Sequence, residues 1–195
     1  NAAVEEQMKK GTIFSLPSPI EAEVAEMLVD LIPCAEMVRY GKNGSDATSG
    51  CIRLARAFTG RDRIAVCGYH GWQDWYIGTT PRNRGVPEST RNLSHTFTYN
   101  NIESLHQILM QHPNEFAAVV MEPMNVTEPA NNFLGEVKDL AHKNGALFIL
   151  DEVITGFRFA KGGAQELFGV TPDLAAFGKG MGNGYPISAV VGRAD

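Results

Sequence analysis

The chain has 195 residues, of which 44% are hydrophobic and 20% charged, and its net charge is −5. This balance is typical of one globular domain that is large enough to bury a core. An acidic chain is a poor match for nucleic acid, because phosphate binding needs a basic face. No apolar run approaches the ~18 residues that span a bilayer, so we expect no membrane partner.

Helices and short apolar runs alternate along the chain. Helices are predicted at residues 20–31, 45–58, 102–111 and 134–144. Strands are predicted at residues 36–40, 63–67, 96–99, 117–121, 146–150, 173–177 and 187–191. Unbroken apolar strands between helices predict an α/β fold, with a mostly parallel seven-stranded sheet covered by helices on both faces in a three-layer αβα arrangement.

Two further stretches bear on organisation and location. Residues 72–91 are rich in Gly, Pro, Arg and Trp without a period, and a loop of that length inside a domain is usually functional. The first ten residues have no apolar signal segment, and the three cysteines have no CxxC spacing, so we expect reduced thiols and a cytoplasmic protein. The missing initiator Met and the strand close to Asp195 lead us to expect an excerpt of a longer polypeptide.

Ligands of such sheets bind at the carboxyl ends of the strands, so the segments that follow the strands are informative. Gly44 and Ser45 open a helix, where free amides, the helix dipole and a hydroxyl can bind an anion. An ordinary N-cap at Ser45 is the alternative. Tyr69 lies between glycines and could stack on a flat ligand, although a packed turn is the simpler interpretation. His70 alone suggests a hydrogen-bonded structural histidine.

Acidic and basic residues follow two later strands. Asp151 and Glu152 end the strand at 146–150, where buried acids need hydrogen bonds or partners. Mg²⁺ binding is a competing interpretation, whereas the scattered histidines lack zinc spacing, so we expect no metal. Lys179 lies among the glycines of residues 178–184, which predicts a positioned, partly desolvated and accessible nucleophile. A surface lysine would not explain those glycines.

These four features match the requirements of pyridoxal 5'-phosphate (PLP). That cofactor needs its phosphate bound, its ring stacked, its pyridine nitrogen kept protonated and its aldehyde joined to an amine.

The chain also carries longer motifs. Residues 150–158 read LDEVITGFR, followed by Pro172, Asp173 and Leu174 and then by Gly178 and Lys179. Residues 37–40 (MVRY), 43–47 (NGSDA) and 69–71 (YHG) add to the pattern. From about Gly11 onward the chain resembles the class III aminotransferases of PLP fold type I, and within them the glutamate-1-semialdehyde 2,1-aminomutase group.

The resemblance implies a role for each of seven site residues. Two are catalytic: Lys179 forms the internal aldimine and shuttles protons, and Asp151 pairs with the pyridine nitrogen. The remaining roles implied for the cofactor are phosphate donors at Gly44 and Ser45, a stacking ring at Tyr69, packing on the opposite ring face by Val153, and a place in the active-site hydrogen-bond network for Glu122.

The resemblance further implies a domain layout and a homodimer. Residues 1–18 would be an N-terminal connecting segment and residues 19–195 the PLP-binding large domain, with the C-terminal small domain absent from the chain. The sequence departs from the family's pattern after the Tyr-His-Gly turn, where Trp72, Gln73, Asp74 and Trp75 follow. Substrate identity is therefore left open.

The expected function is PLP-dependent amino-group transfer on a small amine or amino acid, as an aminomutase or a class III aminotransferase. A transaminase of another amine, such as an amino sugar or an ω-amino acid, is the alternative. A non-catalytic regulator with a PLP fold and a metal-dependent enzyme using Asp151 and Glu152 are more remote alternatives.

Overall fold

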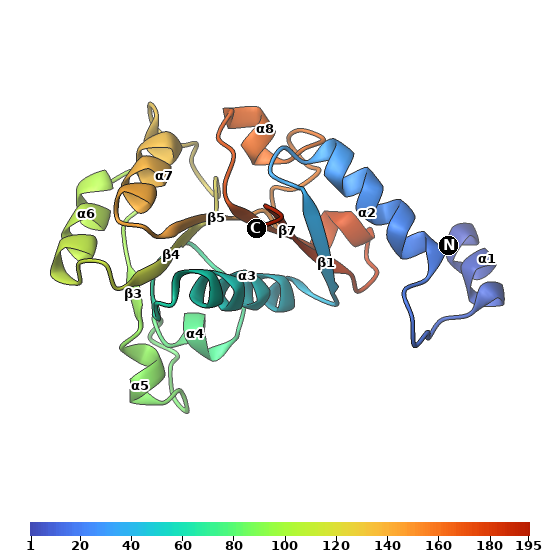
Figure 1. The fold of residues 1–195 in the computed structure, drawn as a ribbon, viewed down its shortest axis with the longest axis horizontal. Helices are drawn as coiled ribbons and strands as arrows, with labels where there is room; N and C mark the ends of the chain where they lie inside the picture. The colour runs from blue at the N-terminus through green and yellow to red at the C-terminus, as the bar shows by residue number, and fades with distance from the viewer.

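The structure is a computed structural model that describes residues 1–195, and its centre is one seven-stranded sheet (Figure 1). The strand order is β1-β7-β6-β5-β4-β2-β3. The strands are β1 (Met37–Gly41), β2 (Arg63–Cys67), β3 (Ser94–Thr96), β4 (Phe116–Met121), β5 (Leu147–Asp151), β6 (Leu174–Phe177) and β7 (Ser188–Gly192). The predicted fold class is therefore confirmed.

Strand direction decides where the site can form. Strands β2 to β6 pair in parallel, and β7 is antiparallel to both of its neighbours, β6 and β1. Since β1 is antiparallel to β7, it runs in the same direction as β6. The carboxyl ends of six strands therefore meet at one edge of the sheet.

Helices cover both faces of this sheet, as Figure 1 shows. Helix α3 packs on one face against β4, β6 and β7, while α2, α6 and α7 lie on the other. The helices are α1 (Ala2–Lys10), α2 (Pro19–Leu31), α3 (Gly44–Thr59), α4 (Asp74–Ile77), α5 (Glu88–Arg91), α6 (Ile102–Gln111), α7 (Phe133–Lys143) and α8 (Ala164–Phe168), with a 3₁₀ turn, η1 (Lys179–Gly182).

The central strands are apolar because both of their faces are covered. Every residue of β4 is buried, and so is every residue of β6 and β7. Three clusters of buried side chains result, one under α3, one under α6 and α7, and one under α2. This is the burial expected of parallel strands between two helical layers.

Local signals in the sequence explain where two helices begin and end. Ser18 and Glu21 form a capping box at the start of α2, with Pro19 in its first turn. Asn43 and Asp46 form the equivalent box at the start of α3. Helix α3 ends at Thr59 and is capped by Gly60, whose φ of 67° lies in the left-handed region that favours glycine.

The structure adds elements that the pattern of apolar residues did not predict. Residues 72–91, expected to be a loop, contain α4 and α5, and the N-terminal segment contains α1. Helices of four residues are too short to show a period, and α1 buries no side chain, so it has no apolar face to detect. None of the helices combines the length and the apolar character needed to cross a membrane.

Candidate functional site

A cavity of about 320 Å³ opens at the carboxyl edge of the sheet. It is formed by segments that follow β1, β2, β4, β5 and β6. Its walls include all seven residues that the sequence predicted for the site. The lining residues are Asn43, Gly44, Ser45, Thr48, Tyr69, His70, Gly71, Trp72, Glu122, Asp151, Val153, Ile154 and Lys179.

The start of α3 supplies polar groups at one wall of the cavity. Gly44 and Ser45 are the first residues of the helix, so their amides have no partner within it. Asn43, rather than Ser45, is the N-cap, since its side chain accepts a hydrogen bond of 3.1 Å from the amide of Asp46. The Ser45 hydroxyl accepts a 3.4 Å hydrogen bond from the amide of Trp72. Amides, hydroxyl and helix dipole therefore converge at this wall, an arrangement that can bind an anion.

Glycines let three loops approach closely around this wall. A Cβ atom on Gly44 would lie 2.7 Å from Cγ1 of Val153, and one on Gly71 would lie 2.1 Å from the Ser45 hydroxyl. Gly71 also has a φ of 97°, which other residues rarely adopt. The contact between the start of α3 and Val153 therefore depends on the absence of a side chain at position 44.

Glu122 holds the turn that carries Tyr69. The carboxylate accepts hydrogen bonds of 2.9 Å from the Tyr69 amide and 3.0 Å from Nδ2 of Asn125. Glu122 is buried, whereas 56% of Tyr69 is exposed, with its ring open to the cavity side and in edge contact with Tyr76 at 5.5 Å. Glu122 thus fixes the backbone of the turn that carries the Tyr69 ring.

Asp151, the last residue of β5, and Glu152, which follows it, have separate partners. The Oδ2 atom of buried Asp151 lies 2.8 Å from Nδ1 of His70, and its Oδ1 atom accepts a 3.0 Å hydrogen bond from the Val153 amide. Glu152 is fully buried, does not line the cavity, and accepts hydrogen bonds from the amides of Ala164 and Gln165.

This arrangement bears on the metal interpretation of Asp151 and Glu152. The two carboxylates share no partner, and no three His, Cys, Asp or Glu side chains gather in a metal-binding group. Each carboxylate is instead stabilised by hydrogen-bond donors of the chain, which is the other way to bury an acid.

Lys179 reaches the cavity from the first position of η1. Its φ of 40° places a non-glycine residue in the left-handed region, directly after buried Gly178. A Cβ atom on Gly178 would lie 3.4 Å from Val153 and 3.6 Å from Cα of Gly44, so this turn packs against the two other loops. The expectation that Lys179 is partly desolvated is wrong for this chain, because the residue is exposed.

Six of the thirteen residues of the cavity wall were not predicted as ligand contacts, among them Thr48, Trp72 and His70. Thr48 lies one turn after Ser45 on the same helix face, a spacing that could have identified it. Trp72 is 69% exposed at the cavity mouth. His70 was interpreted as a hydrogen-bonded structural histidine, and its buried ring does contact a hydrogen-bond partner, Asp151, which the sequence did not identify. Such a contact between loops distant in sequence leaves no local signal.

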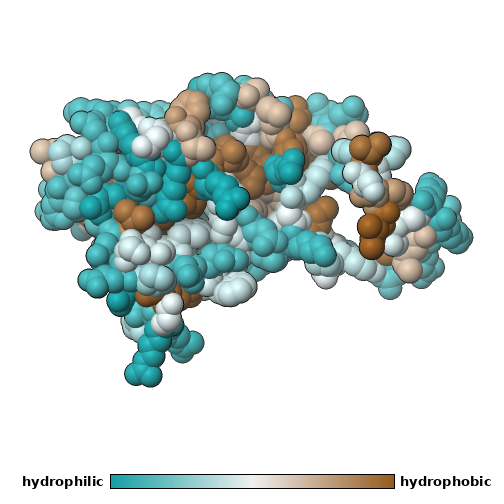
Figure 2. All heavy atoms as spheres, turned by 60° about the horizontal axis from the view of Figure 1, so that its bottom comes forward, coloured by the Kyte–Doolittle hydropathy of each residue, from teal (hydrophilic) through white to brown (hydrophobic).

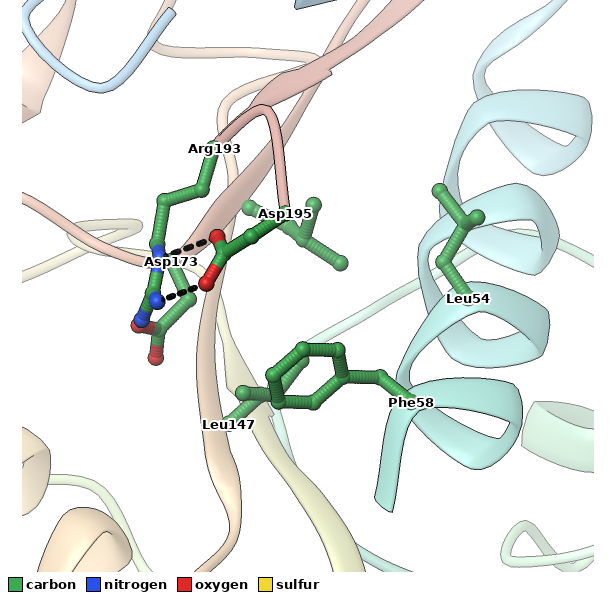
Figure 3. Close-up of a pocket in the computed structure, with 7 residues that line it drawn as sticks. Leu54, Phe58, Leu147, Asp173, Arg193 and Asp195 are labelled. Carbon is green, nitrogen blue, oxygen red and sulfur yellow. Dashed lines mark hydrogen bonds and ion pairs between the residues drawn. The ribbon is translucent and has the colours of Figure 1, made fainter. Parts of the chain in front are cut away.

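A second hollow, of about 100 Å³, lies at the opposite edge of the sheet, where β5 and β6 begin. Figure 3 shows Leu54 and Phe58 of α3 facing Leu147, with Arg193 between Asp173 and Asp195. Asp173 also lies 2.7 Å from Nε2 of His142 and accepts a hydrogen bond from the Phe148 amide. The charged side chains of this hollow, Asp173, Arg193 and Asp195, are paired with one another.

Comparison with known proteins gives the family. The family model for class-III aminotransferases matches residues 1–195. The chain belongs to this family. The predicted resemblance is confirmed, and the fold is that of the PLP fold type I transaminases.

Curated relatives of this class-III chain include an aminomutase and an aminotransferase. It is 40% identical to a glutamate-1-semialdehyde 2,1-aminomutase of Methanothermobacter thermautotrophicus, over 99% of this chain and 49% of the relative. It is also 40% identical to a 3-aminobutyryl-CoA aminotransferase of Cloacimonas acidaminovorans, over 100% of this chain and 48% of the relative. The chain therefore spans about half the length of the curated relatives it matches.

Solved structures of the family superimpose closely on the class-III chain. An omega-transaminase from Sphaerobacter thermophilus has a TM-score of 0.90 at 34% identity, covering 100% of this chain and 49% of its own. The FumI protein of Sphingopyxis sp. MTA144, solved in its PLP internal aldimine form, has a TM-score of 0.91 at 35% identity, covering 99% and 48%.

Proposed function

We propose that the full-length protein is a PLP-dependent enzyme that transfers amino groups of small amines or amino acids. The observation that carries this proposal is the single cavity in which the α3 amides, Tyr69, Asp151 and Lys179 come together. An anion-binding helix start, an aromatic face, a buried carboxylate and an accessible amine fit the phosphate, ring, pyridine nitrogen and aldehyde of PLP. When bound, PLP supplies an aldehyde that joins to amines and a ring that accepts electrons.

The residues of this chain would divide the work as follows. The amides of Gly44 and Ser45 bind the phosphate, and Tyr69 and Val153 hold the two ring faces. Asp151 binds the protonated ring nitrogen, and Glu122 keeps the Tyr69 turn in place. Lys179 attaches the cofactor and, once released, its amine accepts the proton from the substrate carbon and returns it. Its exposed position leaves the amine free to move between these two tasks.

The relatives support amino-group transfer more strongly than one choice of substrate. An aminomutase returns the amine to a neighbouring carbon of the same molecule, whereas a transaminase releases a keto product and takes a second acceptor. Relatives with both names are 40% identical to the chain. An ω-amino acid or a related amine thus stands beside the aminomutase substrate as a candidate. A regulator without turnover would not need both Lys179 and Asp151 in one cavity.

A homodimer in the cytoplasm is part of the proposal. Large hydrophobic side chains are exposed in the segment that joins α1 to α2, including Ile13 and Leu16. Figure 2 shows hydrophobic surface beside the α1 end of the molecule, at the right. Exposed apolar surface of this kind supports association with a second copy of the chain.

Covalent trapping of the cofactor in the full-length protein tests the assignment of PLP and of its lysine. Incubation with PLP, reduction with borohydride and peptide mass analysis should place the cofactor on Lys179. A screen of amine donors, scored by amino-group transfer, then separates mutase from transaminase. Recovery of the reduced cofactor on a different lysine, or its complete absence, would reject the proposed site.

A further inference from the structure

The ring of His70 contacts acceptors through both of its nitrogens. Nε2 lies 3.1 Å from the carbonyl oxygen of Cys67, and Nδ1 lies 2.8 Å from Oδ2 of Asp151. A carbonyl oxygen only accepts hydrogen bonds, so Nε2 must carry a proton. The contact between Nδ1 and a carboxyl oxygen needs a second proton, which resides on either His70 or Asp151.

Two sets of contacts favour His70 as the site of that proton. The Val153 amide donates to Oδ1 of Asp151, and such a bond favours the charged carboxylate. The His70 ring is stacked on Trp75 with centroids 5.9 Å apart and an interplanar angle of 21°, and it meets Tyr76 at 5.3 Å. A cation within about 6 Å of the face of an aromatic ring is attracted to it, and the stacked Trp75 ring presents its face to His70.

The aromatic residues around His70 are themselves anchored. Trp75 and Tyr76 are buried residues of α4. The Trp75 ring nitrogen donates a 3.0 Å hydrogen bond to the hydroxyl of Ser49 in α3. The backbone carbonyl of Trp75 accepts a 2.6 Å hydrogen bond from the hydroxyl of Ser94 in β3. His70 is almost completely buried against this framework, so α4 fixes the ring from behind.

We propose that His70 is a positioning residue, held as an imidazolium between Asp151 and an aromatic box formed by Trp75 and Tyr76. It fixes Asp151 as a carboxylate in one orientation. Trp75 therefore acts behind the cavity, through His70, whereas Trp72 lines the cavity itself. The inference rests on the proposed function only where Asp151 is assigned to the ring nitrogen; the protonation state of His70 is a property of the protein alone.

Proton location is the direct test, and it needs neither cofactor nor turnover. Neutron diffraction or histidine-selective ¹⁵N NMR of the full-length protein at neutral pH should show both His70 nitrogens protonated. In Asp151→Asn, whose amide cannot stabilise the cation, Nδ1 should lose its proton. A single proton on His70 in the wild type, with the other proton on Asp151, would overturn the proposal.

Two substitutions at position 70 test the positioning role through PLP affinity. The amide of His70→Asn can still donate from about the position of Nδ1, whereas His70→Leu removes every donor. Losing a hydrogen bond to a charged group weakens binding about 10- to 100-fold, so His70→Leu should lose that much affinity for PLP and His70→Asn less than about tenfold. Equal affinities for wild type and a folded His70→Leu would reject the role.

Substitutions of Trp75 test separately whether the aromatic box stabilises the protonated His70 ring. Trp75→Phe keeps an aromatic face and should leave His70 doubly protonated, whereas Trp75→Leu should reduce the doubly protonated fraction at the same pH. Identical His70 signals in both variants would show that the box does not stabilise the cation. If wild-type protein fails to bind PLP at all while His70 is doubly protonated, the proposed function fails and the proposal about His70 stands.

Discussion

Lys179 and Asp151 approach the same cavity from opposite environments. The lysine is exposed at the start of a glycine-rich turn, while the aspartate is buried and hydrogen-bonded on both oxygens. An accessible amine suits a residue that must attach and release a cofactor, and a fixed carboxylate suits one that must hold a ring nitrogen. The roles of Lys179 and Asp151 can therefore be distinguished by substituting each residue in turn.

Lys179→Ala is expected to abolish turnover and covalent attachment of PLP while retaining non-covalent binding. The groups around the phosphate and the ring are unaffected by the loss of the amine. Absorbance spectra and borohydride trapping of the full-length variant check this. A lysyl-PLP peptide recovered from the variant would contradict the assignment.

Asp151→Asn is expected to bind PLP but to react about 100-fold more slowly, or worse. A neutral amide cannot keep the ring nitrogen protonated, so the ring accepts electrons less well, and a hydrogen bond to a charged group is lost. Single-turnover rates with a good amine donor measure the effect. Turnover close to that of the wild type would disprove the role of Asp151.

The sequence singled out Gly44, Ser45, Tyr69, Asp151 and Lys179 because each follows a strand or begins a helix, where local motifs are readable. The roles of Glu122 and Val153 were implied only by the family resemblance. The sequence did not predict that His70 contacts Asp151, since that contact joins the loop after β2 to the end of β5. The sequence also did not predict that Lys179 is exposed, because the solvent exposure of a turn depends on which other segments pack against it. Local chemistry was thus predictable, while contacts and coverage required the tertiary structure.

At the scale of elements, Glu152 links three segments that are distant in sequence. Its carboxylate accepts hydrogen bonds from Thr155 and from the start of α8, and Gln165 of α8 in turn accepts one of 3.0 Å from the Cys34 amide that precedes β1. The segment after Asp151 is thereby tied to the helix layer. A buried acid without an ionic partner is stabilised here by several donors.

Glu152→Gln is expected to lower the free energy of unfolding by about 2–3 kcal/mol, because its NH₂ group would face donors and leave a buried amide unpaired. Chemical denaturation of the full-length variant measures the change. Glu23→Gln, on an exposed part of α2, is the matched control and should be close to neutral. Equal losses in the two variants would show that the Glu152 network adds no stability.

The elements themselves were predicted where they are long and periodic. The ranges of β2 and α6 agree with the structure residue for residue, α2 differs by one residue at its start, and α3 and α7 differ by one residue at each end. Helices α4, α5 and α8 were not predicted, because segments of four or five residues show too little of a period. Their positions depend on tertiary contacts such as those of Trp75 and Glu152.

On the scale of the whole molecule, all three cysteines are buried in the core and none forms a disulfide. Burial raises the pKa of Cys34 and of Cys67 to about 12, and it raises that of Cys51 as well. A raised thiol pKa means that the thiol stays protonated, and so unreactive, throughout the neutral range.

We therefore expect the native full-length protein to react with a thiol reagent at these three positions only after unfolding. Labelling at pH 7 to 8 followed by peptide mass analysis, with and without denaturant, measures this. Rapid labelling of Cys34, Cys51 or Cys67 in the folded protein would contradict the burial seen here.

The full-length protein is expected to sediment as a dimer of identical chains. Apolar side chains exposed between α1 and α2 would be covered by the second copy. Substituting Asp for both Ile13 and Leu16 should shift the population toward monomer. Substituting Asp for both Glu5 and Glu6, which are also exposed, should not. Analytical ultracentrifugation at several concentrations decides, and a monomeric wild type would refute the expectation.

The pairing of β1 with β7 has a consequence for synthesis on the ribosome. Met37 pairs with Gly192, so β1 has no neighbour in the sheet until β7 has been made. At translation rates of about 5–20 residues per second, β1 leaves the ribosome some 8–30 seconds before its partner. During that interval the start of α3 lacks the strand that fixes it. Binding of cofactor by a nascent chain must therefore wait until the last strand of the sheet has emerged, however early the helix itself forms.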